Sequence, residues 1–224
     1  MGKAQSILVT GTTGMIGGLV LDQCLNSQDM QRVYGLGRRP SGRNHPGLTE
    51  FLMDDLDSLE SLQIPPVDAV IFCAGVYTGA VPDQEFHSIT IDYPVRLANL
   101  LLAKNSNLRF CLLSGAGADR SEKSRMIFAR SKGAAENRLA SILGDSFYAF
   151  RPAYIYPVEP RKEPNISYSL MRFLYPLVNA VSNKYSIKST ELAEAMVDVA
   201  LNGCEKHILE NSDILTLLNG QGVR

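Results

Sequence analysis

The feature that most constrains this chain is a glycine-spaced turn close to its N-terminus. A short apolar run at residues 7–9 is followed by Gly11, Gly14 and Gly17, and apolar residues then recur at helical spacing between positions 19 and 25. Strand, glycine turn and helix form the layout of a phosphate-binding site, because a helix N-terminus offers unpaired N–H groups and the positive end of its dipole. The turn therefore predicts a nucleotide site.

Each glycine of the turn has a predicted role. Gly11 permits a sharp turn, Gly14 lets the backbone approach a pyrophosphate, and Gly17 lets the helix lie close to the strand. The spacing is GxxGxxG rather than the commoner GxGxxG, so a plain strand-to-helix turn without a ligand is the alternative. The predicted phosphate-binding residues are Gly11, Thr13, Gly14, Met15, Ile16 and Gly17.

Composition limits the partners that the chain is expected to have. With 224 residues, 45% of them hydrophobic, the chain is long enough for one substantial core. A net charge of −1 implies no general attraction to nucleic acid or to an anionic membrane. We expect a small-molecule substrate, no nucleic-acid or membrane partner, and a monomer or homodimer.

Cysteine and histidine spacing and the N-terminal sequence bear on metal sites and cellular location. The four cysteines lack CxxC spacing and are expected to be free thiols, and the three histidines form no metal-ligand pattern, so no metal site is predicted. Residues 1–6 enter the first strand with no secretory signal. We therefore predict a cytoplasmic protein.

Apolar segments that read as strands alternate with helical segments along the rest of the chain. Strands are predicted at 31–37, 50–53, 67–73, 108–114, 147–152 and 207–210, and helices at 91–104, 127–143, 167–181 and 189–201, with a terminal helix capped by Ser212. Such alternation favours right-handed βαβ units and a parallel sheet covered on both faces. The predicted fold class is α/β, a Rossmann-like doubly wound parallel sheet with a small C-terminal lobe. The chain is treated as one domain, 1–224, with a cofactor-binding core at about 1–152 and the lobe at about 153–224.

The end of the second predicted strand bears on cofactor choice. NAD-preferring sites usually carry an acidic residue about 20 residues after the glycines, which binds the ribose hydroxyls. This chain has Arg38 and Arg39 there instead, and guanidinium groups suit a 2′-phosphate. We therefore predict NADP(H) rather than NAD(H), with a solvated basic turn as the alternative.

The next two strand ends carry further candidates. The Asp55 carboxylate is placed to accept a hydrogen bond from an adenine amino group while Leu56 packs on the ring, although an acidic helix-capping turn fits the sequence equally well. Small residues at Cys73, Ala74 and Gly75 allow the backbone to pass close to a ribose, with a tight turn as the alternative.

Together these segments resemble the short-chain dehydrogenase/reductase superfamily, in its extended and atypical branch, and within it the Tat-interacting-protein-like group of small NAD(P)H-binding proteins. The resemblance covers nearly the whole chain and rests on the order and spacing of its motifs. These are VTGTTGMIG at 9–17, GRR at 37–39, DL at 55–56, LLSGAGAD at 112–119, KG at 132–133, FRP at 150–152 and IKSTELAEAM at 187–196.

The resemblance implies a catalytic set with one departure. It assigns Ser114 as the catalytic serine and Lys132 as the lysine of a Tyr-x-x-x-Lys pair, which would also bind the nicotinamide ribose, and it places Pro152 near the nicotinamide amide. The tyrosine position holds Phe128, which has no proton to exchange, and no tyrosine lies between positions 108 and 143. A helix-surface lysine, a strand-end serine and a strand-stopping proline are the alternatives.

Two function classes follow. The first is an NADP-dependent oxidoreductase or isomerase-type enzyme acting on an unknown small carbonyl compound, with a proton donor other than a tyrosine at position 128. The candidate donors are Tyr77, Tyr154, Tyr156, Tyr168, His87 and water. The second class is a catalytically silent NADP(H)-binding regulatory or scaffold protein, which the phenylalanine at position 128 favours on mechanism.

Overall fold

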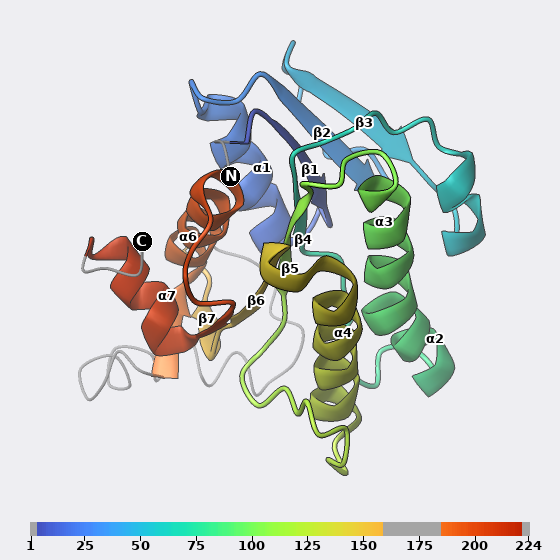
Figure 1. Ribbon diagram of the computed structural model, residues 1–224, viewed down its shortest axis with the longest axis vertical. Coiled ribbons are helices and arrows are strands. Elements are labelled where there is room, and N and C mark those ends of the chain that lie inside the picture. Colours follow the sequence, from blue (N-terminus) through green and yellow to red (C-terminus); the bar gives the residue numbers. More distant parts are fainter. Residues whose placement is uncertain (1–3, 159–184, 221–224) are drawn as a thin grey trace.

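The computed structural model describes residues 4–158 and 185–220 and is built on a seven-stranded parallel sheet (Figure 1). The strand order is β3-β2-β1-β4-β5-β6-β9, and every neighbouring pair is parallel. The strands are β1 (Ser6–Thr10), β2 (Arg32–Gly37), β3 (Leu48–Leu52), β4 (Ala69–Phe72), β5 (Arg109–Leu113), β6 (Phe147–Arg151) and β9 (Ile208–Glu210). The predicted α/β Rossmann-like fold is confirmed.

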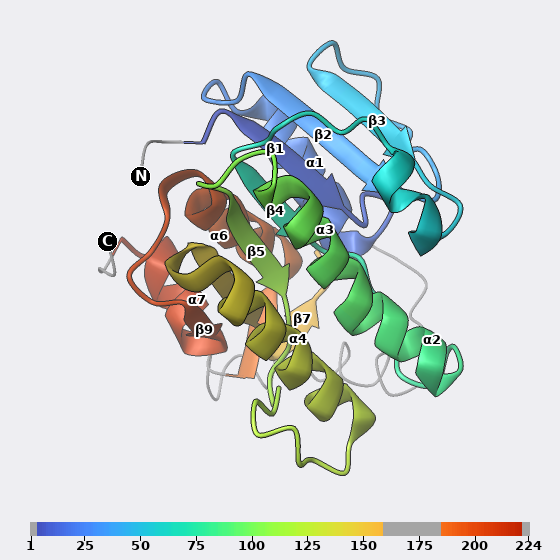
Figure 2. The same cartoon turned by 45° about the vertical axis from the view of Figure 1, so that its right-hand side comes forward.

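Helices cover both faces of the sheet. α1 (Met15–Asn26) and α6 (Ser189–Asn202) pack on one face, and α3 (Tyr93–Leu102) and α4 (Ile127–Leu143) pack on the other (Figures 1 and 2). Because side chains alternate along a strand, β1 contributes side chains to the hydrophobic cores on both faces of the sheet. Ile7 and Val9 join the core beneath α1 and α6, while Leu8 joins the core beneath α3 and α4.

The segment between β4 and α3 differs from the prediction. A short helix, α2 (Asp83–His87), leads into one π-helical turn, η2 (Ser88–Asp92), before α3 begins. The helix predicted at 91–104 therefore starts later in α-helical form. Single π-helical turns are frequent at functional sites, and hydrophobic periodicity does not reveal them. The other short helices are η1 (Leu56–Ser61) and η3 (Gly144–Ser146).

The C-terminal part is attached to the main sheet. β7 (Tyr154–Tyr156) and β8 (Ser186–Lys188) form a two-stranded parallel sheet, whereas β9 extends the main sheet beside β6. α7 (Asn211–Leu218) follows β9. The Arg109 guanidinium donates to the carbonyls of Ala200 and Leu201 at 2.6 and 2.9 Å, which joins the C-terminal end of α6 to β5.

Three predictions about this part have different outcomes. The cap predicted at Ser212 is wrong, because Glu210 caps α7 and its backbone N–H donates to Asp213 Oδ2 at 2.9 Å. The helix predicted at 167–181 lies outside the described residues. The division into a core and a lobe near residue 152 stays a prediction.

Candidate functional site

The candidate site lies at the carboxyl ends of the strands, where the strand order reverses. β1 and β4 are neighbours at the centre of the sheet, with β2 on one side and β5 on the other. The connections that follow β1 and β4 lead to opposite faces of the sheet, which leaves a crevice beyond the strand ends. Open α/β sheets bind ligands at this reversal point.

The glycine turn is held by backbone contacts that a side chain would block. Gly11 has φ +69°, and a Cβ there would lie 2.8 Å from the backbone C and O of Cys73. A Cβ on Gly17 would overlap the carbonyl of Gly11, so the close approach of α1 to the end of β1 requires glycine. A Cβ on Gly14 would lie 3.1 Å from the same carbonyl oxygen. Gly11 and Gly17 thus have the geometry expected from the sequence.

The start of α1 suits an anion. Gly14 is the N-cap residue and supplies no side-chain cap, and no acidic residue stands in the first turn. The N–H groups of such a first turn lack helical partners and carry the positive end of the dipole. Thr13 is exposed beside this turn, Met15 is half-buried, and Ile16 is buried beneath it.

Thr10 fastens the ends of β1 and β4 together. Its Oγ1 accepts hydrogen bonds from the backbone N–H groups of Cys73 and Ala74, each at 3.1 Å. The small residues after β4 therefore lie directly beside the glycine turn, where the sequence predicted a close backbone passage. The sequence reasoning missed Thr10.

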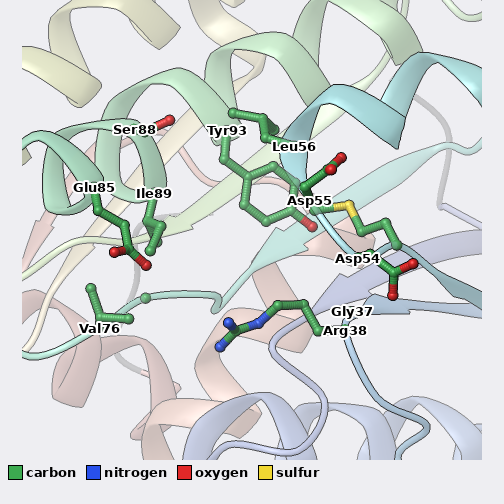
Figure 3. Close-up of a pocket in the computed structure, with 12 residues that line it drawn as sticks. Gly37, Arg38, Asp54, Asp55, Leu56, Val76, Glu85, Ser88, Ile89 and Tyr93 are labelled. Atoms are coloured by element: carbon green, nitrogen blue, oxygen red, sulfur yellow. The ribbon is translucent and has the colours of Figure 1, made fainter. Parts of the chain in front are cut away.

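A pocket of about 320 Å³ opens past the ends of β2, β3 and β4 (Figure 3). Its volume is at the lower end of the range for small-molecule sites. Gly37, Arg38, Met53, Asp54, Asp55, Leu56, Gly75, Val76, Glu85, Ser88, Ile89 and Tyr93 line it. The structure therefore brings together four predicted cofactor residues, Arg38, Asp55, Leu56 and Gly75.

The two arginines after β2 are not equivalent. Arg38 lines the pocket, and its side chain extends across the pocket toward Val76 (Figure 3). Both arginines are exposed, but Arg39 is not among the lining residues. Of the two arginines, Arg38 is therefore the one placed to contact a ligand in this pocket.

Asp55 has the capping role that the sequence left open. Its Oδ1 accepts a hydrogen bond from the backbone N–H of Ser58 at 2.9 Å, which caps η1. Leu56 forms part of the pocket wall directly after it. One carboxylate oxygen of Asp55 is thus occupied by this capping hydrogen bond.

Tyr93 is the pocket residue that the sequence reasoning missed most clearly. It is 7% exposed, its ring meets Phe72 edge-on at 4.9 Å, and its hydroxyl has no hydrogen-bond partner within the described part of the chain. Burial raises the pKa of this hydroxyl. Tyr93 is the first residue of α3 and directly follows the π-helical turn. Hydrophobic periodicity did not predict this turn.

At the other end of the crevice, Ser114 is committed to an ion-pair network. Its hydroxyl donates to Glu136 Oε1 at 2.5 Å. Glu136 is fully buried on α4 and also accepts from Arg151, at 3.0 Å to Oε1 and 2.6 Å to Oε2. Arg151 reaches on to Glu210 at 2.9 Å. The proton that a catalytic serine would offer to a substrate oxygen is directed at a buried carboxylate.

Lys132 and Phe128 lie one helical turn apart on α4. Lys132 Nζ donates to the carbonyl of Leu113 at the end of β5, at 2.9 Å. Desolvation of its ammonium lowers the pKa of Lys132 to about 8, which the nearby Glu136 carboxylate partly opposes. The ring of Phe128 covers Gly115, where a Cβ would lie 2.6 Å from the ring Cζ. The space of the expected tyrosine is therefore filled by an apolar ring.

None of the described alternative proton donors is among the residues lining the pocket. Tyr77 is exposed, and Tyr154 and Tyr156 belong to β7. His87 is exposed, with Nδ1 3.5 Å from Asp92 Oδ2. Tyr168 lies outside the described residues. Pro152 is buried, and its carbonyl accepts from the Ala116 N–H at 2.9 Å, so it holds the loop after β5.

Across residues 4–158 and 185–220, no cluster of His, Cys, Asp and Glu has the arrangement of a metal site. In the same residues, no helix is both long enough and apolar enough to cross a bilayer. The four cysteines, all in the described part of the chain, are thiols and not disulfides, and burial raises the pKa of each thiol.

Comparison with known proteins overturns the predicted cytoplasmic location. The chain is 22% identical, over 97% of its length and 96% of the relative's, to the protein named fmp52, mitochondrial, of Aspergillus clavatus. It is 24% identical over 62% of each chain to FMP52, mitochondrial, of Lodderomyces elongisporus. The prediction relied on the missing secretory signal, which does not distinguish cytoplasm from mitochondria.

Solved structures share the fold at low sequence identity. A thiolation-reductase di-domain of an archaeal non-ribosomal peptide synthetase has a TM-score of 0.70 at 14% identity, covering 100% of this chain and 78% of that one. A short-chain dehydrogenase/reductase superfamily protein of Agrobacterium tumefaciens with bound NAD has a TM-score of 0.66 at 17% identity, covering 92% and 76%.

The sequence profile described as the NAD dependent epimerase/dehydratase family matches residues 7–131. This match begins in β1, includes the glycine turn and the pocket, and ends in α4 just before Lys132. The matched segment is more than half of the chain. The chain belongs to the NAD-dependent epimerase/dehydratase family, within the extended short-chain dehydrogenase/reductase superfamily.

Proposed function

We propose that this protein binds NADP(H) in the crevice at the strand ends. The residues present fit a dinucleotide, because the backbone contacts at Gly11 and Gly17 leave no room for a Cβ at either position. Past the ends of β2, β3 and β4 lies a pocket with an apolar wall and an arginine. A cradle of this kind beside a pocket is the arrangement that a pyrophosphate and an adenosine need.

Each end of the crevice would hold a different part of the dinucleotide. The backbone N–H of Gly14 already donates to the Gly11 carbonyl at 2.8 Å, so the N–H groups of Met15 and Ile16 at the start of α1 would bind the pyrophosphate. Leu56 and Ile89 would pack on the adenine. Lys132 would hold the nicotinamide ribose through its remaining N–H groups. When bound, the dinucleotide supplies or accepts a hydride.

The observation that carries the NADP(H) preference is the position of Arg38. It follows β2, where NAD sites usually place an acid, and its guanidinium extends across the pocket (Figure 3). A guanidinium matches the geometry and charge of a 2′-phosphate.

Binding titrations test this preference. NADPH and NADH are titrated by fluorescence into the wild type, Arg38→Ala and Arg39→Ala. We expect Arg38→Ala to weaken NADPH binding by about tenfold or more and to leave NADH binding nearly unchanged. Arg39→Ala is the matched control, with an expected change below about threefold. Equal binding of both dinucleotides with no effect of Arg38 would refute the proposal.

We further propose that the chain is an oxidoreductase for a small carbonyl compound, as its superfamily suggests. A second candidate, a catalytically silent NADP(H)-binding regulatory protein, is favoured by a specific observation. The side chain at position 128 has no proton to give, and the Ser114 proton is directed at Glu136.

A carbonyl panel with wild type and Phe128→Tyr separates the two candidates. NADPH oxidation by the wild type above the buffer rate supports the enzyme and excludes the silent binder. Turnover that arises only in Phe128→Tyr supports the silent binder, because a tyrosine restores the missing proton donor next to Lys132. Binding of NADPH is checked in both variants first.

Three further points belong to this proposal. The order of motifs supports the Tat-interacting-protein-like group within the superfamily. The names of the fungal relatives support a mitochondrial location, which imaging of a tagged full chain would test. We also propose a small-molecule substrate, a monomer or homodimer, and no nucleic-acid or membrane partner.

A further inference from the structure

The connection between β2 and β3, residues 38–47, has no helix of its own. It carries Arg38 at its start and returns in non-helical form to the beginning of β3. Parallel strands are usually joined by a helix, whose internal hydrogen bonds fix its shape. The shape of this connection therefore depends on the contacts that it makes with its surroundings.

Arg43 makes the main contact between this connection and α1. Its Nε donates to Asp22 Oδ1 at 2.9 Å and its Nη2 donates to Asp22 Oδ2 at 2.8 Å, a bidentate pair. Its Nη1 also donates to the carbonyl of Ser41 at 3.0 Å, within the connection itself. One guanidinium thus joins the connection to the helix that begins at the glycine turn.

Two neighbouring features support this contact. The backbone N–H of Ser41 donates to Glu50 Oε1 on β3 at 2.8 Å, so the connection is also held from the sheet. Gly18 on α1 leaves space for the Arg43 guanidinium, since a Cβ there would lie 3.2 Å from Nη2. The connection is therefore fixed at residues 41 and 43, only a few residues after Arg38.

We propose that the Asp22–Arg43 pair is a latch that positions Arg38 for a 2′-phosphate and so sets the preference for NADP(H) over NAD(H). The inference rests on the proposed NADP(H) function. Arg43 acts as a positioning residue, because its donors are directed at Asp22 and Ser41. The hydrogen bonds of Arg43 to Asp22 and to the Ser41 carbonyl hold the connection that begins with Arg38, so NAD(H), which lacks the 2′-phosphate, is expected to gain little from the latch.

The physical basis is preorganisation. A segment without regular secondary structure loses conformational freedom when a ligand fixes it, and that loss weakens binding. With the latch in place, the start of the connection is ordered before the dinucleotide arrives. Without the latch, the ordering has to accompany binding of the 2′-phosphate, and only the ligand that carries this phosphate is penalised.

The test compares Arg43→Ala and Asp22→Asn with a matched control, Arg96→Ala. Arg96 makes a similar bidentate pair with Glu60, at 2.9 and 2.6 Å, and is 32% exposed against 34% for Arg43. It lies on α3, away from the connection. Kd values for NADPH and NADH are measured by fluorescence in every variant. Hydrogen exchange of residues 38–47 is measured without cofactor.

We expect both latch variants to weaken NADPH binding by about five- to tenfold, with NADH binding changed less than about twofold. Exchange of residues 38–47 should become faster in the latch variants and stay unchanged in Arg96→Ala. If the pair only stabilised the fold in general, its loss would weaken the binding of NADPH and the binding of NADH by the same factor.

Three results overturn the inference. Unchanged exchange in the latch variants, or equal loss of NADPH and NADH binding, would refute the latch while leaving the NADP(H) proposal intact. A wild type that binds both dinucleotides equally would refute the cofactor preference itself, and the proposed role of the latch in selectivity with it. The wild-type ratio is measured first, so the two failures are distinguished.

Discussion

The two ends of the crevice are built from different parts of the chain. At the phosphate end, the geometry comes from the backbone: Gly11 and Gly17 have no room for a Cβ, and Thr10 holds the backbone after β4. At the other end lie Ser114, Phe128 and Lys132, where we propose that the nicotinamide binds, and we call it the hydride end. Its geometry comes from charged side chains, because Glu136 joins Ser114 to Arg151. The first end presents backbone N–H groups at the start of α1, whereas the second directs its side-chain donors at other groups of the protein.

This difference separates binding from chemistry. A site built from backbone N–H groups and glycines binds an anion without any particular side chain. Proton transfer needs a side chain with a suitable proton facing the substrate. The protein has the backbone N–H groups and glycines that anion binding needs. Its serine hydroxyl and the side chain at position 128 do not offer a suitable proton to a substrate. Four changes test this contrast.

The largest effect is expected at the hydride end, from Glu136→Leu. Its carboxylate is fully buried and pairs with an arginine that is 14% exposed, so its removal leaves a largely buried guanidinium with Glu210 as the remaining carboxylate partner among the described residues. We expect the free energy of unfolding to fall by about 3–5 kcal/mol in urea denaturation.

Two companion variants show whether the charge is the cause. Glu136→Gln keeps an acceptor for Ser114 and should lose less stability. In the double variant Glu136→Leu/Arg151→Met, the uncompensated charge is gone, so the loss should be smaller than the sum of the two single losses. Strict additivity would contradict the network.

At the phosphate end, Gly17→Ala should have the next largest effect. The added Cβ would overlap the Gly11 carbonyl and lie 2.9 Å from the Thr10 carbonyl oxygen, both of which are backbone atoms. We expect the free energy of unfolding to fall by about 2–3 kcal/mol and NADPH binding to weaken by more than about tenfold, because the start of α1 must move.

Gly18→Ala is the control for this change. Its new Cβ would meet the end of the flexible Arg43 side chain at 3.2 Å and the carbonyl oxygen of Thr12 at 3.3 Å, neither of them closer than 3 Å. Stability should change by less than about 1 kcal/mol, because alanine favours the helix. Similar losses in both variants would show that backbone approach is not what shapes the phosphate end.

The same contrast explains what the sequence predicted. Glycine spacing reports backbone geometry directly, so the turn at Gly11, the close contact at Gly17 and most strand positions were predictable from local pattern. α4 was predicted with the bounds that the structure has. The local sequence pattern was sufficient to predict these features because each of them depends on residues that are close together in the chain.

Non-local side-chain pairing was not predictable in this way. The bonds of Glu136 with Ser114 and Arg151 join residues 22 and 15 positions apart, and no spacing rule reports them. Tyr93 reaches the pocket through a π-helical turn that hydrophobic periodicity does not show. β7 and β8 are three-residue strands, too short for a pattern.

A smaller, pH-dependent effect is expected at Lys132. Its pKa is lowered from 10.5 to about 8 in the folded state, so between these values the unfolded chain binds more protons. Stability therefore rises with pH across about 8 to 10.5, because the cost of burying the charge disappears, and is independent of this group below about pH 8. Partial exposure limits the gain to about 1–2 kcal/mol.

Urea denaturation at several pH values, in wild type and Lys132→Met, checks this effect. The buried cysteines have raised pKa values and act in the opposite direction as pH rises, but they are present in both proteins and cancel in the difference. The stability of the wild type relative to the variant should increase from about pH 8 upward. A constant difference would show that Lys132 is well solvated.

The smallest effect is expected in the pocket, from Tyr93→Phe. The hydroxyl is buried without a partner among the described residues, and such a group costs about 1–3 kcal/mol of desolvation that no hydrogen bond offsets. Its removal preserves the edge-on contact with Phe72, so the free energy of unfolding of the cofactor-free protein should rise by about 0.5–1 kcal/mol.

Tyr148→Phe is the matched control, since Tyr148 is 6% exposed and its hydroxyl accepts from the Cys204 N–H at 3.4 Å. That variant should be slightly destabilised. A loss of stability in Tyr93→Phe equal to that in Tyr148→Phe would mean that the Tyr93 hydroxyl already has a partner in the cofactor-free protein, and the pocket would then be less open to a ligand than its lining indicates.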